Sequence, residues 1–141
     1  MPHPCLTGRR RRWAFIRLLG VLAWTGVGGA LADSNFPFNH ELVLDAQPMK
    51  GSKRVPSLDI AANGSAEIDL WCNKVRGQLV VAGDTITIVT GPKTERQCPP
   101  ERAQGDEEML SALTEVTNWR REGDVLILTG PRTVRFRLQT N

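Results

Sequence analysis

The chain has 141 residues, which is enough for one domain, and it contains 18 Lys and Arg against 15 Asp and Glu. Its net charge of +3 depends on five arginines before residue 18; from residue 33 onward, thirteen basic residues face fifteen acidic ones, a net charge of −2. This balance excludes a nucleic-acid-binding function argued from a basic surface.

The N-terminal segment has the pattern of an export signal. Four consecutive arginines, residues 9–12, precede an apolar run over residues 18–30. That run has 13 residues, fewer than the ~20 that a membrane-spanning helix needs. The small-x-small pattern Ala30-Leu31-Ala32 predicts cleavage between Ala32 and Asp33.

We therefore expect a cleavable signal peptide over residues 1–32 and a single domain over residues 33–141. The mature protein is expected to be periplasmic or secreted, and not anchored in the membrane after cleavage. An uncleaved N-terminal anchor is the alternative. Cys5 precedes the apolar run, so it does not stand where a lipid-attachment cysteine would follow that run.

Short apolar runs separated by turn residues predict strands over the first half of the domain. Residues 41–45 read as a first strand and residues 48–56 as a loop. Residues 58–62 and 66–70 form a hairpin pattern across Asn63-Gly64, which predicts a type I′ turn. Residues 74–77 are expected to be a connection, and a second hairpin is expected to turn at Gly83-Asp84.

One helix is predicted, over about residues 106–116. Pro99-Pro100 is expected to interrupt regular structure before it. Met109, Leu110, Leu113 and Val116 follow helical spacing on one face. Asp106, Glu107 and Glu108 are expected to form a solvated first turn that suits the helix dipole; a metal site is the alternative.

A third hairpin, over residues 116–121 and 125–129, and a last alternating strand over residues 134–138 complete the pattern. The predicted fold is mainly β. It is an antiparallel meander of seven or eight strands that forms a partly open barrel, with the single helix packed on or in it.

Cys72 and Cys98 are the two cysteines left after signal cleavage, an even number that favours a disulfide in an oxidising compartment. Such a bridge closes a loop of 27 residues and is expected to stabilise the domain by about 3.5 kcal/mol. Two buried free thiols are the alternative.

At this point the chain resembles the META/HslJ-like domain family. The resemblance covers about residues 42–138 and is carried by Asp69-Leu70-Trp71-Cys72-Asn73, Thr94-x-x-x-Cys98, the acidic helix with Leu113, Trp119 and the two terminal strands. It implies a β domain around one helix, in small exported bacterial proteins associated with stress response, and it transfers no catalytic residue. The family usually has Gly before the first cysteine, where this chain has Trp71.

We therefore predict a non-enzymatic periplasmic protein without cofactor or metal, acting in envelope stress or as an interaction module. An unknown envelope protein or lipid is the expected partner. A carrier of lipid or of small apolar ligands is the main alternative. A Cys-His hydrolase and a zinc site, both built on His40 and the two cysteines, are weaker ones.

Trp71, Asn73 and Trp119 are the candidate ligand or partner contacts. For the two tryptophans the alternative is to cover an open edge of the barrel, and for Asn73 it is to hydrogen-bond a turn. Four arginines on neighbouring strands suggest either a solvated face or a patch for an anionic lipid or envelope polymer; they are Arg120, Arg121, Arg135 and Arg137.

Overall fold

A computed structural model of the chain describes residue 1 and residues 35–140. The chain divides into two units, residues 1–30 and 31–141, and every helix and strand described lies in the second. The predicted signal peptide and its cleavage between Ala32 and Asp33 lie outside the described residues.

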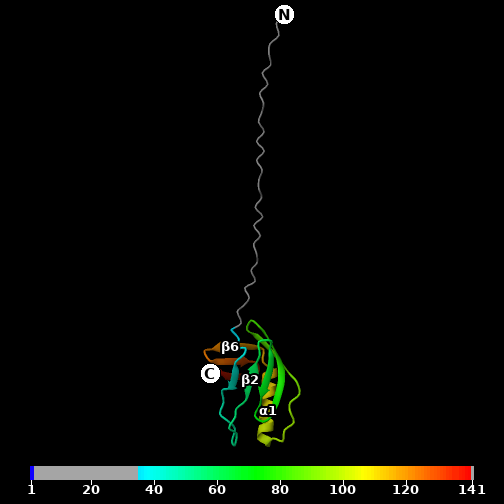
Figure 1. The fold of residues 1–141 in the computed structure, drawn as a ribbon, viewed down its shortest axis with the longest axis vertical. Coiled ribbons are helices and arrows are strands. Elements are labelled where there is room, and N and C mark those ends of the chain that lie inside the picture. The colour runs from blue at the N-terminus through cyan, green and yellow to red at the C-terminus, as the bar shows by residue number, and fades with distance from the viewer. Residues whose placement is uncertain (2–34, 141) are drawn as a thin grey trace. The chain divides into compact units, whose positions relative to one another are not determined.

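Eight antiparallel strands follow one another around a closed barrel, with one helix between the fifth and the sixth (Figure 1). Their bounds are β1 Glu41–Leu44, β2 Ser57–Ile60, β3 Ser65–Asp69, β4 Lys74–Ala82, β5 Thr85–Thr90, α1 Pro100–Thr114, β6 Asn118–Glu122, β7 Val125–Thr129 and β8 Thr133–Leu138. Leu42 of β1 pairs with Leu138 of β8, which closes the ring. The predicted mainly β barrel with one helix is confirmed.

The first hairpin does not have the predicted type I′ turn. That turn needs positive φ at both central residues, and of Asn63 and Gly64 only Gly64 has it, with φ of 81°. Instead the Gly64 N–H donates to the Ala61 carbonyl at 2.9 Å, and Asn63 Oδ1 accepts from the Ser65 N–H at 3.0 Å. A Cβ at position 64 would lie 2.3 Å from the Leu79 carbonyl oxygen, so the close approach of β4 also requires glycine.

Strand β4 is longer than predicted. Residues 74–77, expected to be a connection, are its first four residues, and they pair with β3 from Lys74 opposite Asp69 to Gly77 opposite Ala66. The second half of the strand pairs with β5. A run with few apolar residues can be a strand because only Val75 faces the core there, while Arg76 is exposed.

The helix begins six residues before its predicted start, at Pro100. Pro99 is the N-cap and Pro100 the first helical residue, where a missing N–H leaves no hydrogen bond unmade, so the Pro-Pro pair starts the helix rather than preventing it. Asp106 therefore lies in the middle of α1 and not in a solvated first turn. It is fully buried, which corrects the predicted solvated position.

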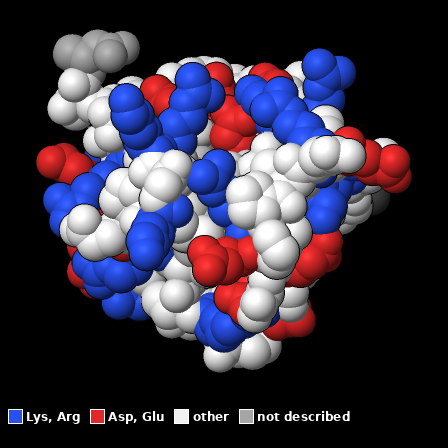
Figure 2. Space-filling model, turned by 90° about the horizontal axis from the view of Figure 1, so that it is seen from below, with Lys and Arg blue, Asp and Glu red and all other residues white. Residues whose placement is uncertain are grey.

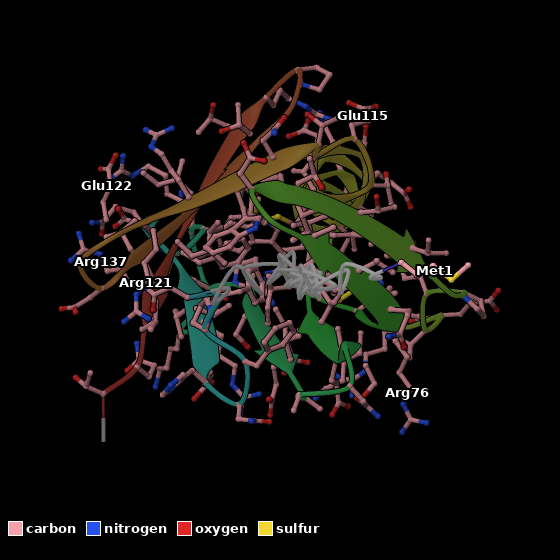
Figure 3. The ribbon with its side chains drawn as sticks, turned by 90° about the horizontal axis from the view of Figure 1, so that it is seen from above. Met1, Arg76, Glu115, Arg121, Glu122 and Arg137 are labelled. Carbon is pink, nitrogen blue, oxygen red and sulfur yellow. A yellow bond between two sulfur atoms is a disulfide. The ribbon has the colours of Figure 1, made fainter. Side chains whose placement is uncertain are left out.

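The seam between β5 and β6 is short, with one residue pair, Thr85 opposite Asn118. Helix α1 packs against β5 and β8, and its Met109, Ala112 and Leu113 join the hydrophobic core. Figure 3, which looks into the barrel from above, shows α1 beside β5, side chains inside the ring of strands, and Arg76, Arg121 and Arg137 pointing away from it. The interior is thus filled by side chains.

Candidate functional site

The antiparallel order of the strands places three connections at one end of the barrel. These are the loop between β1 and β2 (residues 45–56), the link between β3 and β4 (residues 70–73) and the loop between β5 and α1 (residues 91–99). The Cys72–Cys98 disulfide joins the second connection to the third, so we call this the disulfide end. Its Sγ atoms are 2.08 Å apart and its Cα atoms 6.0 Å apart, and the predicted bridge is confirmed.

The buried carboxylate of Asp106, on α1, binds the disulfide end through three hydrogen bonds. It accepts hydrogen bonds from the backbone N–H of Cys72 at 3.0 Å, the backbone N–H of Asn73 at 3.0 Å and Asn73 Nδ2 at 2.9 Å. Three donors converge on one buried anion, and hydrogen bonds to charged groups are stronger than neutral ones. Helix α1 therefore fixes the backbone of residues 72–73.

The side chain of Asn73 in turn hydrogen-bonds the third connection, the loop of residues 91–99. Its Oδ1 accepts from Thr94 Oγ1 at 3.0 Å and from the Arg96 N–H at 2.9 Å, and its Nδ2 also lies 3.2 Å from Cys98 Sγ. The side chain is buried, with 4% of its surface exposed. The structure thus gives Asn73 the turn-forming position that was the alternative, although the bonds span two loops. Contact with a ligand stays a prediction for this residue.

Besides the link through Asn73 and Asp106, a salt bridge connects loop 91–99 to α1 directly. The Lys93 ammonium pairs with the Glu107 carboxylate, and this hydrogen bond raises the pKa of Lys93 above its usual value. The loop is therefore held by a disulfide, an amide side chain and an ion pair. Such bracing leaves few conformations to lose when a ligand binds.

Trp71 packs on α1 at Gly105, the one glycine of this helix. A Cβ on Gly105 would lie 2.7 Å from Trp71 Cδ1 and 2.5 Å from Met49 Cε, closer than real Cβ atoms approach other atoms. The missing side chain of Gly105 therefore makes room for the indole. This accounts for the large residue at a position where the resemblance led us to expect glycine.

A groove of about 660 Å³ opens beside Trp71 at the disulfide end. All three connections line it, and so does Arg102 of α1. Its charged lining residues are five cations and two anions, namely Lys53, Arg54, Lys74, Arg96, Arg102, Glu41 and Asp69. Figure 2, which views the molecule from below, shows Lys and Arg gathered over this end with Asp and Glu between them.

Trp119, the other predicted contact, lies near the turn between β4 and β5, at what we call the aromatic end. Its ring packs edge-on against Phe36, with centroids 5.0 Å apart, and Phe36 packs against Phe38 at 4.7 Å. The indole Nε1–H donates to the Gly83 carbonyl at 2.9 Å. In this position the side chain covers the barrel end, which was the alternative for it; contact with a ligand stays a prediction.

Three of the four arginines of β6 and β8 have acidic partners, and Arg121 donates instead to the Gly123 carbonyl and to Asn35 Oδ1. Asp45 accepts from Arg137 Nε at 2.8 Å and lies 3.7 Å from Arg135 Nε, and Glu122 pairs with Arg120 at 2.8 Å. The hydrogen bond from Arg137 lowers the pKa of Asp45 below its ordinary value. Most of the predicted patch is therefore neutralised.

Two of these arginines also have an apolar neighbour. Ile127 of β7 is fully buried, although it is not part of the central core, and its cross-strand neighbours are Arg120 and Arg135. Aliphatic arginine stems can cover apolar surface while their charges stay in water. The arrangement fits the solvated face that was one of the two predictions for these residues.

The residues proposed for catalytic or metal chemistry do not form such a site. Cys72 and Cys98 are bonded to each other, so neither offers a thiol. Within residues 35–140, no group of three or more His, Cys, Asp or Glu side chains is arranged to hold a metal ion. In the same part of the chain, no helix is long and apolar enough to cross a membrane.

Sequence reasoning missed the residues that build the site. Asp106 was assigned to solvent, and neither Gly105 nor the loop arginines Arg54 and Arg96 were singled out. Because the predicted helix began at residue 106, Gly105 stood just outside it, and nothing in the sequence signalled that this glycine packs against another side chain.

A small closed β-barrel with one helix at its seam, braced at one end by a disulfide and a buried aspartate, defines the class of protein. The META domain model matches residues 31–141 of the chain. The chain therefore belongs to the META domain family, as the resemblance predicted.

Solved structures show the same fold at low sequence identity. A protein from Burkholderia xenovorans, solved by NMR, is 19% identical with a TM-score of 0.60, over 74% of this chain and 84% of that one. A second NMR structure is 16% identical with a TM-score of 0.57, over 71% and 89%. A DUF4847 family protein from Bacteroides vulgatus is 17% identical over 58% of this chain and 57% of that one, with a TM-score of 0.46, and we base no conclusion on this similarity. No curated protein matches the chain.

Proposed function

We propose that this chain is an exported, non-enzymatic META-domain protein that acts as a binding module in the cell envelope, in the periplasm or secreted, as part of a stress response. One observation carries the proposal: the groove at the disulfide end is open and charged, yet two of its three walls, residues 70–73 and 91–99, are held by a disulfide and by the Asp106 and Asn73 hydrogen bonds. A braced concave surface suits recognition, because little order remains to be gained on binding.

The disulfide supports the exported location. Structural disulfides persist in oxidising compartments and are rare in the bacterial cytosol. The pattern of residues 1–32 supports the same location.

The alternative of a lipid carrier has less support. A carrier barrel encloses an apolar cavity, whereas this interior is occupied by leucine, isoleucine, valine and phenylalanine side chains and by the apolar face of α1. The groove lies outside that core, and its lining is largely polar and charged. We therefore place recognition on the surface.

Export is tested by expressing the full chain in a bacterium with a C-terminal tag. We expect the tagged protein in the periplasmic fraction or the medium, with the mass of residues 33–141 and the tag, less two hydrogens for the disulfide. Replacing Ala30 and Ala32 by large residues should leave the precursor uncleaved. Recovery of the full-length chain from the cytosol would contradict the location.

Binding is tested by crosslinking in intact cells. The double variant Arg54→Gln/Arg96→Gln removes two groove cations, and Arg76→Gln/Arg120→Gln removes two exposed cations outside the groove with the same change in net charge. An envelope component recovered with the wild type and the control, and lost with the groove variant, is the expected result. Recovery that is equal for all three proteins would contradict the proposed role of the groove.

A further inference from the structure

Resting on the proposed binding role, we propose that the groove at the disulfide end binds an acidic saccharide. The carboxylate or phosphate groups of the ligand lie on Arg54 and Arg96, and a sugar ring lies against Trp71. This assigns the groove a ligand class from three features that meet there: unpaired cations, braced walls and an indole with an unused donor.

The first feature is the state of the cations. Lys74 pairs with Asp69 at 2.8 Å, and Arg102 donates to the Gly51 carbonyl at 2.8 Å. Among residues 35–140, the side chains of Lys53, Arg54 and Arg96 have no ion pair. The groove thus concentrates unneutralised positive charge on a domain whose net charge is −2 from residue 33 onward. Arginine suits carboxylate and phosphate because its planar fork can hold two oxygens.

The second feature is how the two arginines are presented. Arg54 belongs to loop 45–56, where its backbone N–H donates to Ser52 Oγ at 3.2 Å and its carbonyl accepts from the same hydroxyl at 2.9 Å. Arg96 belongs to loop 91–99, where Asn73 holds its backbone. The two cations come from different walls of a groove of about 660 Å³, which is within the roughly 300–1,000 Å³ of small-molecule sites. Because the two arginines belong to different loops that line the groove, a ligand with two acidic groups can pair with both of them.

The third feature is Trp71, which is half-buried and lines the groove. Its Nε1–H has no acceptor among the described residues, whereas that of Trp119 is bonded to Gly83. Indole combines an apolar face with one polar donor, and a sugar ring combines an apolar C–H face with hydroxyl acceptors. The Cδ1 and Nε1 edge of Trp71 lies against Gly105, so a sugar ring would pack on the apolar surface of the indole that lines the groove.

A membrane surface fits this end less well than a saccharide does. Within residues 35–140, the exposed large apolar side chains are Val80 and Val89, on β4 and β5 and outside the groove lining. Interfacial binding requires apolar side chains beside the cations, to enter the acyl boundary. An extended acidic peptide matches the charge, but it has no ring for Trp71.

The test uses tetragalacturonate as the probe, with protein expressed from the full chain. Titration is followed by calorimetry and by the indole N–H signals in NMR, which Trp71→Phe and Trp119→Phe assign. We expect the Trp71 signal to shift and the Trp119 signal to stay. Affinity should fall about tenfold or more in Arg54→Gln/Arg96→Gln, the loss expected for charged hydrogen-bond donors, and less than about twofold in Arg76→Gln/Arg120→Gln, because exposed charges outside the groove contribute little.

Four further probes set the ligand class: maltotetraose for a neutral saccharide, inorganic phosphate, tetraglutamate for an acidic peptide, and phosphatidylglycerol vesicles. Each should bind at least about tenfold more weakly than tetragalacturonate, since each lacks the ring, the acidic groups or the shape. Tighter or equal binding of tetraglutamate or vesicles, or equal losses in the two double variants, overturns the saccharide assignment. If the saccharide fails while the groove variant still loses its crosslinked envelope component, the ligand class falls and the binding role stands.

Discussion

The two ends of the barrel are closed in different ways, and each carries one of the two tryptophans in the described domain. At the aromatic end, Trp119 is packed on Phe36 and its indole donor is bonded to Gly83. At the disulfide end, Trp71 leans on Gly105, its donor is unused, and a charged groove lies beside it. Both residues were equal candidates for ligand contact in the sequence.

The difference shows how one small barrel separates stability from recognition. The aromatic end is closed by packed aromatic rings and one indole hydrogen bond to a backbone carbonyl, without a buried charge among its described residues. The disulfide end cannot be closed by packed apolar side chains in the same way, since its loops carry polar and charged residues. It is held instead by a covalent bond and by a buried carboxylate with three donors. A stiff polar frame is what leaves a groove open at that end.

The largest expected effect is at Asp106. Asp106→Asn replaces an anion that accepts three hydrogen bonds by an amide whose NH₂ group faces donors, so the free energy of unfolding should fall by about 3 kcal/mol. Urea unfolding measures this, and hydrogen exchange should show loop 91–99 opening first. Glu108→Gln, on the exposed side of the same helix, is the control and should change stability by less than about 0.5 kcal/mol. A loss below about 1 kcal/mol for Asp106→Asn would show that the network does not brace this end.

The next effect separates the tryptophans directly. Trp119→Ala should lower the free energy of unfolding by about 2–3 kcal/mol, because the ring is partly buried against Phe36, and it should leave tetragalacturonate binding unchanged. Trp71→Ala should lower stability by about 1 kcal/mol, because Trp71, unlike Trp119, is not packed against the hydrophobic core of the described domain, and should weaken binding. Thermal unfolding and calorimetry on both variants decide the matter. The reverse pattern would exchange the roles assigned to the two ends.

A smaller effect tests whether Gly105 and Trp71 depend on each other. Gly105→Ala in the wild type should cost about 1–2 kcal/mol of stability, because the new methyl group overlaps the indole. In a Trp71→Gly background the flexible end of Met49 can move into the vacated space, and the same change should stabilise the protein by up to about 1 kcal/mol, since alanine is the better helix former. A double-mutant cycle in urea measures this change of sign. The same sign in both backgrounds would mean that the glycine serves another purpose.

The smallest effect concerns Arg137, which forms an ion pair with Asp45, whereas Arg54 and Arg96 of the groove have no ion pair among the described residues. Arg137 holds the folded pKa of Asp45 below its ordinary value of 3.8. The ion pair therefore contributes stability above that value and loses it as pH falls through the folded pKa. Asp45→Asn should be less stable than the wild type near neutral pH, with the difference vanishing in strong acid and shrinking in salt, since Arg137 is exposed and Asp45 is only partly buried. An NMR titration of Asp45 with no downward shift would contradict the pairing.

Much of the fold could be read from local pattern. Alternation predicted seven or eight strands and the inward face of β8, and glycines marked where hairpins turn, although not the turn type at Asn63-Gly64, because strand period and turn position depend on neighbouring residues. The family could be identified from the spacing of a few landmarks around Cys72 and Cys98. The start of α1 could not be read in this way, because a Pro-Pro pair either stops a helix or begins one, depending on the residues C-terminal to it.

The site depended on contacts between distant segments. Asp106 reads as a solvated helix acid until the chain brings residues 72 and 73 onto it, across more than thirty positions. The large side chain at position 71 and the glycine at position 105 are accounted for only when the helix packs against the connection that carries Trp71. By itself, the sequence determined a β-barrel and its family, since these depend on local periodicity and spacing, and it favoured the disulfide that the structure then confirmed. Only the tertiary structure decided which tryptophan covers an end and which lines a groove, because burial and unpaired charge depend on the side chains that the rest of the fold places beside each residue.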